Sequence, residues 1–176
     1  MPKTILISAG HSETDPGAVS KLFKEADLAV ILRDKVASLL RAKSISVLTD
    51  GADGINDPLN KAISLAKTVN GPAVEIHFNA GAPSANGIEA LCKPNNKPIA
   101  QALCQAIAKE TLFKLRGDFG YKPDDSGQHH RLGFCEAGGI ILEVCFISND
   151  NDMNAYISRV DKVAAAIAGV LANFSH

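Results

Sequence analysis

The chain has little that would direct it to a membrane or to nucleic acid. Its 176 residues include no apolar stretch long enough to span a bilayer. The formal net charge is −1 and no segment concentrates Lys and Arg, which argues against a phosphate-backbone partner. Residues 1–3 lead directly into a strand-like segment, without the long apolar region and cleavage site of a secretory signal. We therefore expect no membrane or nucleic-acid partner, and synthesis in the cytoplasm.

Cysteine is also scarce, and its spacing is not that of a metal site. The four cysteines include no CxxC pair and lie in or beside apolar segments, so we expect buried, reduced thiols. A chain of this length can bury most of the apolar surface of its unfolded form without disulfides or a structural metal. No linker, repeat or low-complexity segment interrupts the sequence, and we expect one domain over residues 1–176.

Strand-like and helix-like patterns alternate along the chain, which predicts an α/β fold with helices packed on the faces of a sheet. The helical segments should each present one apolar side, and the last should begin after Asn149 and Asp150. Residues 116–139 show no sustained period and include a His129-His130 pair, so they predict a long loop. The helices are expected at about 25–43, 58–69, 98–115 and from 149–150 onward; the strands at 4–8, 45–49, 73–79, 87–92 and 140–147.

Two histidines and a glutamate stand where these patterns make them conspicuous. His11 follows the first apolar run, and His77 lies near the end of another, directly before a loop. Ligands of open α/β sheets bind at the carboxyl ends of strands, so both positions favour a functional site. Glu143 lies inside a third apolar run, where a carboxylate costs several kcal/mol to bury unless it is paired or bound to metal.

Glu25, in the first turn of a predicted helix, completes a possible metal site. Catalytic zinc takes three protein ligands and keeps a fourth position for water, and two His with one Glu is a known set. His11, Glu25 and His77 supply that set, whereas Glu143 is suited to be the general base of a hydrolysis. The structural alternative for Glu25 is a carboxylate favoured by the helix dipole, and for each histidine a hydrogen-bonded side chain.

The order of these motifs resembles the zinc-dependent N-acetylmuramoyl-L-alanine amidases over nearly the whole chain. The resemblance implies a mostly parallel twisted β-sheet flanked by α-helices on both faces. It also implies one Zn²⁺ held by His11, Glu25 and His77, a catalytic Glu143, and peptidoglycan as the substrate. The motifs are SAGHS at 8–12, DPGA at 15–18, Glu25, EIHFNA at 75–80, GIE at 87–89 and ILEVCFISN at 141–149.

Several departures and additions bear on substrate binding. SAGHS replaces the family's usual DPGHG, as in divergent members of bacteriophage origin, and Cys145 stands where glycine is common. Asn79 should share a strand face with His77 and is a candidate to orient substrate or a ligand. Glu89 matches a family position near the substrate groove, with a salt bridge as the alternative. Glu13 and Asp15 are interpreted as turn residues, and His129-His130 as a solvated loop.

Similar housekeeping amidases generally carry a signal peptide, wall-anchoring repeats or both. We expect neither a signal peptide nor a separate cell-wall-binding domain here, which favours a phage or prophage endolysin. A bacterial autolysin of the same family is the alternative. A Cys/His amidase or endopeptidase would instead use Cys145, taken to share a strand face with Glu143, together with His77. A non-catalytic peptidoglycan-binding module with the same fold is a third hypothesis. Gram type, stem-peptide preference and oligomeric state are not indicated.

Overall fold

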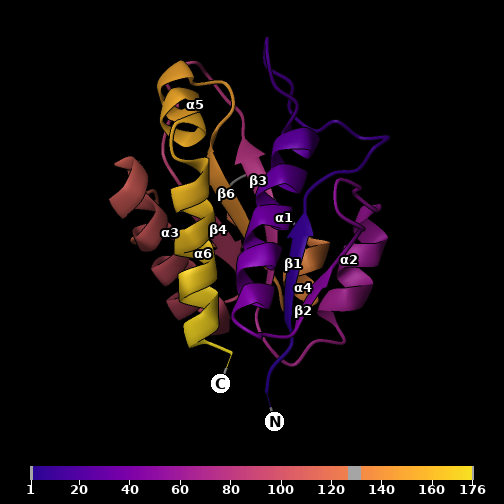
Figure 1. Cartoon of the computed structure of the whole chain (residues 1–176). Helices are drawn as coiled ribbons and strands as arrows, with labels where there is room; N and C mark the ends of the chain where they lie inside the picture. The colour runs from indigo at the N-terminus through magenta and orange to yellow at the C-terminus, as the bar shows by residue number, and fades with distance from the viewer. Residues whose placement is uncertain (1, 127–131, 176) are drawn as a thin grey trace.

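The computed structural model describes residues 2–126 and 132–175. Figure 1 shows strands and helices alternating along the chain. The strands are β1 (Ile5–Ala9), β2 (Val47–Thr49), β3 (Ala73–Asn79), β4 (Glu89–Cys92), β5 (Tyr121–Pro123) and β6 (Ile140–Phe146). The helices are α1 (Glu25–Ala42), α2 (Leu59–Ala66), α3 (Lys97–Thr111), α4 (Gly133–Glu136), α5 (Asp150–Ile157) and α6 (Val160–Asn173), with a 3-10 turn at Pro94–Asn96.

The six strands form one sheet in the order β2-β1-β3-β6-β4-β5. β1, β2, β3 and β6 run parallel, whereas β4 is antiparallel to β6 and parallel to β5. The predicted single α/β domain with a mostly parallel sheet and flanking helices is therefore confirmed. No helix in the described part of the chain is long and apolar enough to cross a bilayer.

The two faces of the sheet differ in polarity. One face packs against α1, α3, α5 and α6 and forms the main core, to which β3 contributes Val74, Ile76 and Phe78. Figure 1 shows α1 and α6 crossing in front of this face. A smaller apolar cluster on the other face involves α2 and α4. Because side chains alternate along a strand, Glu75, His77 and Asn79 point to this second face, where the polar residues gather.

The segment 116–139 is not the continuous loop that the sequence predicts. It contains β5, which extends the sheet, and the short helix α4, which packs on the second face. These elements have three and four residues, too few for a hydrophobic period to show. The His129-His130 pair lies outside the described residues.

Two helix boundaries also differ from the prediction. The closing helix is divided at Ser158 and Arg159, because the Arg159 amide donates to the Tyr156 carbonyl in a tight turn and its φ of −134° leaves the helical region. Helix α3 ends at Thr111 because Leu112 takes a left-handed φ of 64°. The apolar stripe of the closing segment continues across the break, which is why periodicity alone joins the two helices.

Candidate functional site

His11 lies in a tight turn just beyond the carboxyl end of β1. Its backbone is left-handed, with φ of 68°, an uncommon conformation for a residue with a side chain. The Nδ2 amide of Asn56 donates to the carbonyls of Gly10 and His11, at 2.8 and 3.0 Å. Asn56 is buried, so this contact fixes the turn that aims the imidazole at the site.

Glu25 is the first residue of α1 and is almost fully buried. Its Oε1 accepts the amide N–H of Phe78 and its Oε2 that of Ala18, both at 2.9 Å. The same two oxygens lie 2.9 Å from Nδ1 of His77 and Nε2 of His11, respectively. Burial alone would raise the Glu25 pKa, but the hydrogen bonds from both histidines outweigh it and hold that pKa well below its usual range.

The two imidazoles face each other across Glu25, with ring centroids 5.1 Å apart and planes at 72°. The nitrogens that do not face Glu25 also meet carboxylates: Nε2 of His77 lies 3.0 Å from Glu75, and Nδ1 of His11 lies 3.0 Å from Asp15. The hydrogen bond to Glu25 raises the His11 pKa. Burial would lower the His77 pKa, but the hydrogen bonds to Glu25 and Glu75 outweigh burial and raise that pKa.

His11, Glu25 and His77 therefore form a cluster able to hold a metal ion, with one ligand atom from each residue within 4.8 Å of the others. Two glycines approach the rings closely from the backbone. A Cβ at Gly10 would lie 2.3 Å from Cε1 of His77, and a Cβ at Gly17 would lie 2.5 Å from Cδ2 of His11. Glycine is therefore required at both positions, and the φ of +63° at Gly17 adds a second reason.

Glu143 lies on β6 directly opposite His77 of β3. Burial raises the Glu143 pKa to about 7, against the opposing effect of His77. Among residues 2–126 and 132–175, no hydrogen-bond partner reaches its buried Oε2. A hollow of about 280 Å³ joins Glu143 to all three residues of the metal-capable cluster, and Asn79, Leu132 and Ile141 also line it.

Asn79 of β3 and Glu89 of β4 come from the two strands that flank β6, the strand of Glu143, and their side chains meet. Nδ2 of Asn79 donates to Oε1 of Glu89 at 3.0 Å, and Glu89 forms ion pairs with Arg116 and Lys122. These cations lower the Glu89 pKa despite its burial. The salt-bridge alternative for Glu89 is thus present in the structure, whereas substrate contact by Asn79 and Glu89 stays a prediction.

Comparison with known proteins gives this geometry a family. The model of the family described as "N-acetylmuramoyl-L-alanine amidase" matches residues 5–173. The chain belongs to this amidase family.

Individual proteins are similar to this chain over most of its length. A solved structure from Neisseria meningitidis, described as a candidate N-acetylmuramoyl-L-alanine amidase, is 46% identical, with a TM-score of 0.89 over 97% of this chain and 94% of that one. The catalytic domain of the amidase CwlV from Bacillus (Paenibacillus) polymyxa var. colistinus shares the fold, at 23% identity and a TM-score of 0.82 over 97% of each chain. The uncharacterized protein YqiI of Bacillus subtilis strain 168 is 25% identical over 94% of this chain and 81% of its own.

Cys145 of the amidase does not share the strand face of Glu143, contrary to the expectation from sequence. The register between β3 and β6 shifts after the His77–Glu143 pair, so Val144 and Cys145 both turn into the main core. The Cys145 thiol lies 4.0 Å from the Met153 sulfur, and burial raises its pKa. All four cysteines are buried and free, as expected.

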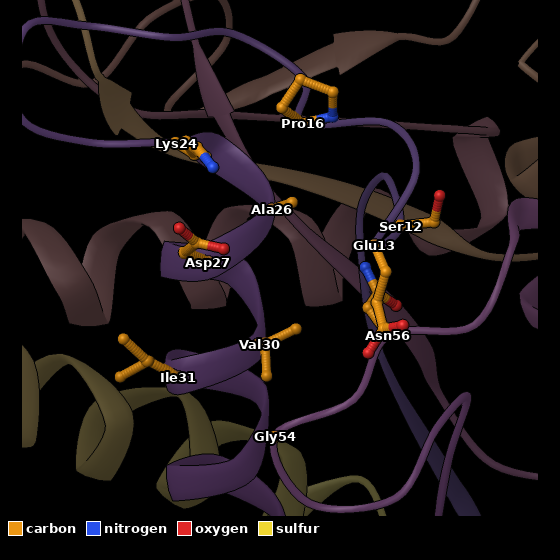
Figure 2. Close-up of a pocket in the computed structure, with 10 residues that line it drawn as sticks. All are labelled: Ser12, Glu13, Pro16, Lys24, Ala26, Asp27, Val30, Ile31, Gly54 and Asn56. Atoms are coloured by element: carbon orange, nitrogen blue, oxygen red, sulfur yellow. The ribbon is translucent and has the colours of Figure 1, made fainter.

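A hollow of about 440 Å³ on the other side of the His11 loop could be mistaken for the amidase site. Figure 2 shows Glu13 and Pro16 on one side of it, and on the other Asp27 of α1 and Lys24, which precedes that helix. Neither His77 nor Glu143 lines this hollow, which brings together no set of catalytic groups.

Sequence reasoning missed four residues that contact the site. Glu75 stands two positions before His77, so strand alternation alone could have placed it beside the ring. Asp15 lies four positions from His11, and its turn chemistry gives no sign that its carboxylate also contacts the ring. Arg116 and Lys122 fall in the segment interpreted as a loop, and no local signal linked them to Glu89 on another strand.

Proposed function

We propose that this amidase hydrolyses the amide between the lactyl group of N-acetylmuramic acid and L-alanine of peptidoglycan, with one Zn²⁺ held by His11, Glu25 and His77. Family membership carries the bond and the substrate. The observation that carries the zinc mechanism is the convergence of those three side chains beside Glu143, whose buried oxygen has no partner among the described residues.

The donor set fits zinc. Two imidazole nitrogens and a carboxylate are ligands that zinc favours, and three protein ligands leave a position open. The nitrogens that face Glu25 are Nε2 of His11 and Nδ1 of His77. Zinc binding would displace the protons on those nitrogens, so affinity should fall as pH falls.

Asp15 and Glu75 act as positioning residues in this proposal. Each carboxylate lies 3.0 Å from the histidine nitrogen that points away from Glu25. Such a contact keeps the proton on the outer nitrogen, orients the ring and leaves the inner nitrogen as the ligand. Glu75 is 2% exposed, so its hydrogen bond is protected from competing water.

Glu143 is the proposed general base and acid. Zinc would polarise the scissile carbonyl and lower the pKa of the attacking water. The Glu143 carboxylate removes a proton from that water and then delivers it to the leaving nitrogen of L-alanine. Its raised pKa suits this exchange, because a group that titrates near neutral pH can both accept and release a proton.

The cysteine hypothesis has no support from the geometry. A catalytic thiol must lie within reach of its base and of substrate, whereas Cys145 packs in the core on the opposite face from Glu143. Its raised pKa also disfavours the thiolate. Cys145→Ala should therefore leave activity intact, and chelation should abolish it.

The test is identification of the bond cut by purified protein in peptidoglycan. We expect new L-alanine amino groups and free lactyl carboxyl groups in equal amounts, without new reducing sugar ends, and loss of both products in EDTA with recovery on adding Zn²⁺. Release that persists in EDTA would contradict the zinc mechanism. Binding to peptidoglycan without release would favour the non-catalytic module.

The endolysin role stays a prediction, with the bacterial autolysin as its alternative. Both would use the chemistry proposed above, so experiments on whole cells are needed to distinguish the two roles. An endolysin should leave cells intact when it is produced alone in the cytoplasm and lyse them once the membrane is permeabilised. Slow wall turnover in growing cells, without any membrane lesion, would favour the autolysin.

A further inference from the structure

We propose that Arg116 and Lys122, anchored by Glu89, form a subsite for the carboxylate of the stem-peptide residue that follows L-alanine. The inference rests on the proposed function, because that reaction places the peptide next to Glu143. In unamidated peptidoglycan the group is the α-carboxylate of the second, D-glutamyl residue. The juxtaposition that carries the proposal is a pair of cations on one buried carboxylate, beside the proposed catalytic glutamate.

The charges of this subsite do not cancel. Glu89 is the one carboxylate that forms ion pairs with Arg116 and Lys122 among the described residues, so two cations share one paired carboxylate. Glu143, opposite Glu89 on β6, is a separate carboxylate. Two other lysines are balanced by carboxylates, since Lys97 pairs with Asp118, and Lys93 pairs with Asp124 and Glu136. A buried carboxylate is neutralised by one cation, and Glu89 also accepts the amide of Asn79. The second cation is surplus to the needs of Glu89.

Both cations are held in place yet retain free donors. The Arg116 guanidinium lies 4.8 Å from the ring centroid of Phe146, and its Nη1 donates to the Asn86 carbonyl. Arginine has five N–H donors and lysine three, so each side chain has donors beyond those that Glu89 occupies. The Arg116 and Lys122 side chains are 31% and 29% exposed, which leaves them accessible but partly shielded from water. A carboxylate would find a preorganised, charge-assisted site.

The subsite also lies beside Glu143, the residue that the proposed function places at the scissile bond. Glu89 of β4 is directly opposite Glu143 of β6, and such antiparallel pairs have Cα atoms about 4.5–5.5 Å apart. An extended peptide advances about 3.3–3.6 Å per residue, so the residue that follows L-alanine can extend from Glu143 toward β4. The metal-capable cluster lies on the other flank of Glu143, on the side of β3. The sugar should therefore lie toward β3 and the peptide toward β4 and β5.

Two substrates that differ in one group test the subsite: MurNAc-L-Ala-γ-D-Glu-L-Lys, with a free α-carboxylate, and its D-isoglutamine analogue, with an α-carboxamide. We expect the zinc-loaded protein to cleave the carboxylate substrate with a kcat/KM about tenfold higher. Lys122→Met should reduce this preference to about twofold or less, chiefly by slowing the carboxylate substrate. Arg116→Gln should do the same and serves as the second variant.

Lys97→Met is the matched control, because Lys97 is also a partly exposed lysine in an ion pair but does not contact Glu89. Its preference should stay tenfold. Equal kcat/KM for the two substrates with wild-type protein would overturn the subsite, as would a preference that survives both Lys122→Met and Arg116→Gln. Failure of the proposed function looks different: neither substrate nor intact peptidoglycan would be cleaved, and the subsite would fall with it.

Discussion

Glu25 and Glu89 have similar surroundings, but their clusters suit ligands of opposite charge. Each carboxylate is buried, 4% and 5% exposed, and each bridges two basic side chains that lower its pKa. The two carboxylates flank Glu143. Glu25 pairs with His77 of β3 on one side, and Glu89 lies on β4 on the other. The partners differ: Glu25 meets two histidines, whereas Glu89 meets an arginine and a lysine.

The type of partner decides what each cluster can bind. Histidine loses a proton near neutral pH and then offers a lone pair, so the Glu25 cluster can exchange protons for a metal ion. Arginine and lysine keep their protons at that pH, so the Glu89 cluster stays cationic and can attract an anion. Two similar ion-pair clusters thus support the two ends of the proposed reaction, carbonyl activation and peptide binding.

The largest expected effect separates the two glutamates directly. Glu25→Gln should lose zinc on dialysis and reduce kcat/KM by about 10³-fold or more, because it removes a charged ligand. Glu89→Gln should retain one zinc per chain and reduce kcat/KM by about tenfold or less. Metal analysis and kinetics on the same samples check this. Equal zinc loss in both variants would break the comparison.

Among the residues near the metal-capable cluster that are not proposed ligands, Gly10 should be highly sensitive to substitution. Gly10→Ala places a Cβ within 2.3 Å of the His77 ring, so the ring must move, and displacement by about 1 Å can cost 10²-fold in rate. Gly169→Ala is the matched control, because Gly169 is at an exposed position of helix α6 and no atom within 4 Å would meet its Cβ. Alanine stabilises a helix by about 0.5–1 kcal/mol relative to glycine. Normal zinc affinity and turnover in Gly10→Ala would show that His77 does not need its present position.

Glu75→Gln tests whether His77 needs a charged partner on its outer nitrogen. Loss of such a partner typically weakens metal binding by 10–100-fold, and we expect this range in competition with a chelator. The equivalent change on the other flank, Glu89→Gln, should leave zinc affinity unchanged within about twofold. Unchanged affinity in Glu75→Gln, with wild-type thermal stability, would assign Glu75 no positioning role.

The pH profile gives the smallest effect and reports on Glu143 between the two clusters. The base acts as a carboxylate, so kcat/KM should rise with pH as Glu143 loses its proton and level off above its pKa. Burial raises that pKa to about 7, and a divalent cation beside it would lower the pKa again, so the midpoint should fall between 4.5 and 7. Profiles should be recorded in excess zinc, with bound zinc measured at each pH. A flat profile from pH 4 to 8 at constant zinc content would contradict this assignment.

The sequence predicts the metal side of the site far better than the peptide side. His77 and Glu143 are visible because each breaks a clear strand pattern, and His11 because it directly follows such a strand. Glu25 is visible because it begins a strongly periodic helix. Parallel strands then bring their carboxyl ends together by topology alone. The location of these residues in one hollow is therefore a consequence of the α/β pattern.

The remaining features depend on contacts that no local pattern encodes. Lys122 sits on a three-residue strand whose place in the sheet is decided by pairing with β4. The face of Cys145 is inverted by a register shift of a kind that alternation cannot reveal. The buried Arg33 is a further case, since its ion pair with Asp50 and bonds to the carbonyls of Ala52 and Ile55 join α1 to the segment after β2.

The most direct test of the central claim is zinc content and turnover of Glu143→Gln, measured on one preparation beside the wild type and His77→Ala. The distinct roles of the two facing residues predict that Glu143→Gln keeps one zinc per chain while kcat falls by about 10²–10⁴-fold, whereas His77→Ala loses both zinc and turnover. Zinc lost equally in both variants, or wild-type turnover in Glu143→Gln, would contradict the account.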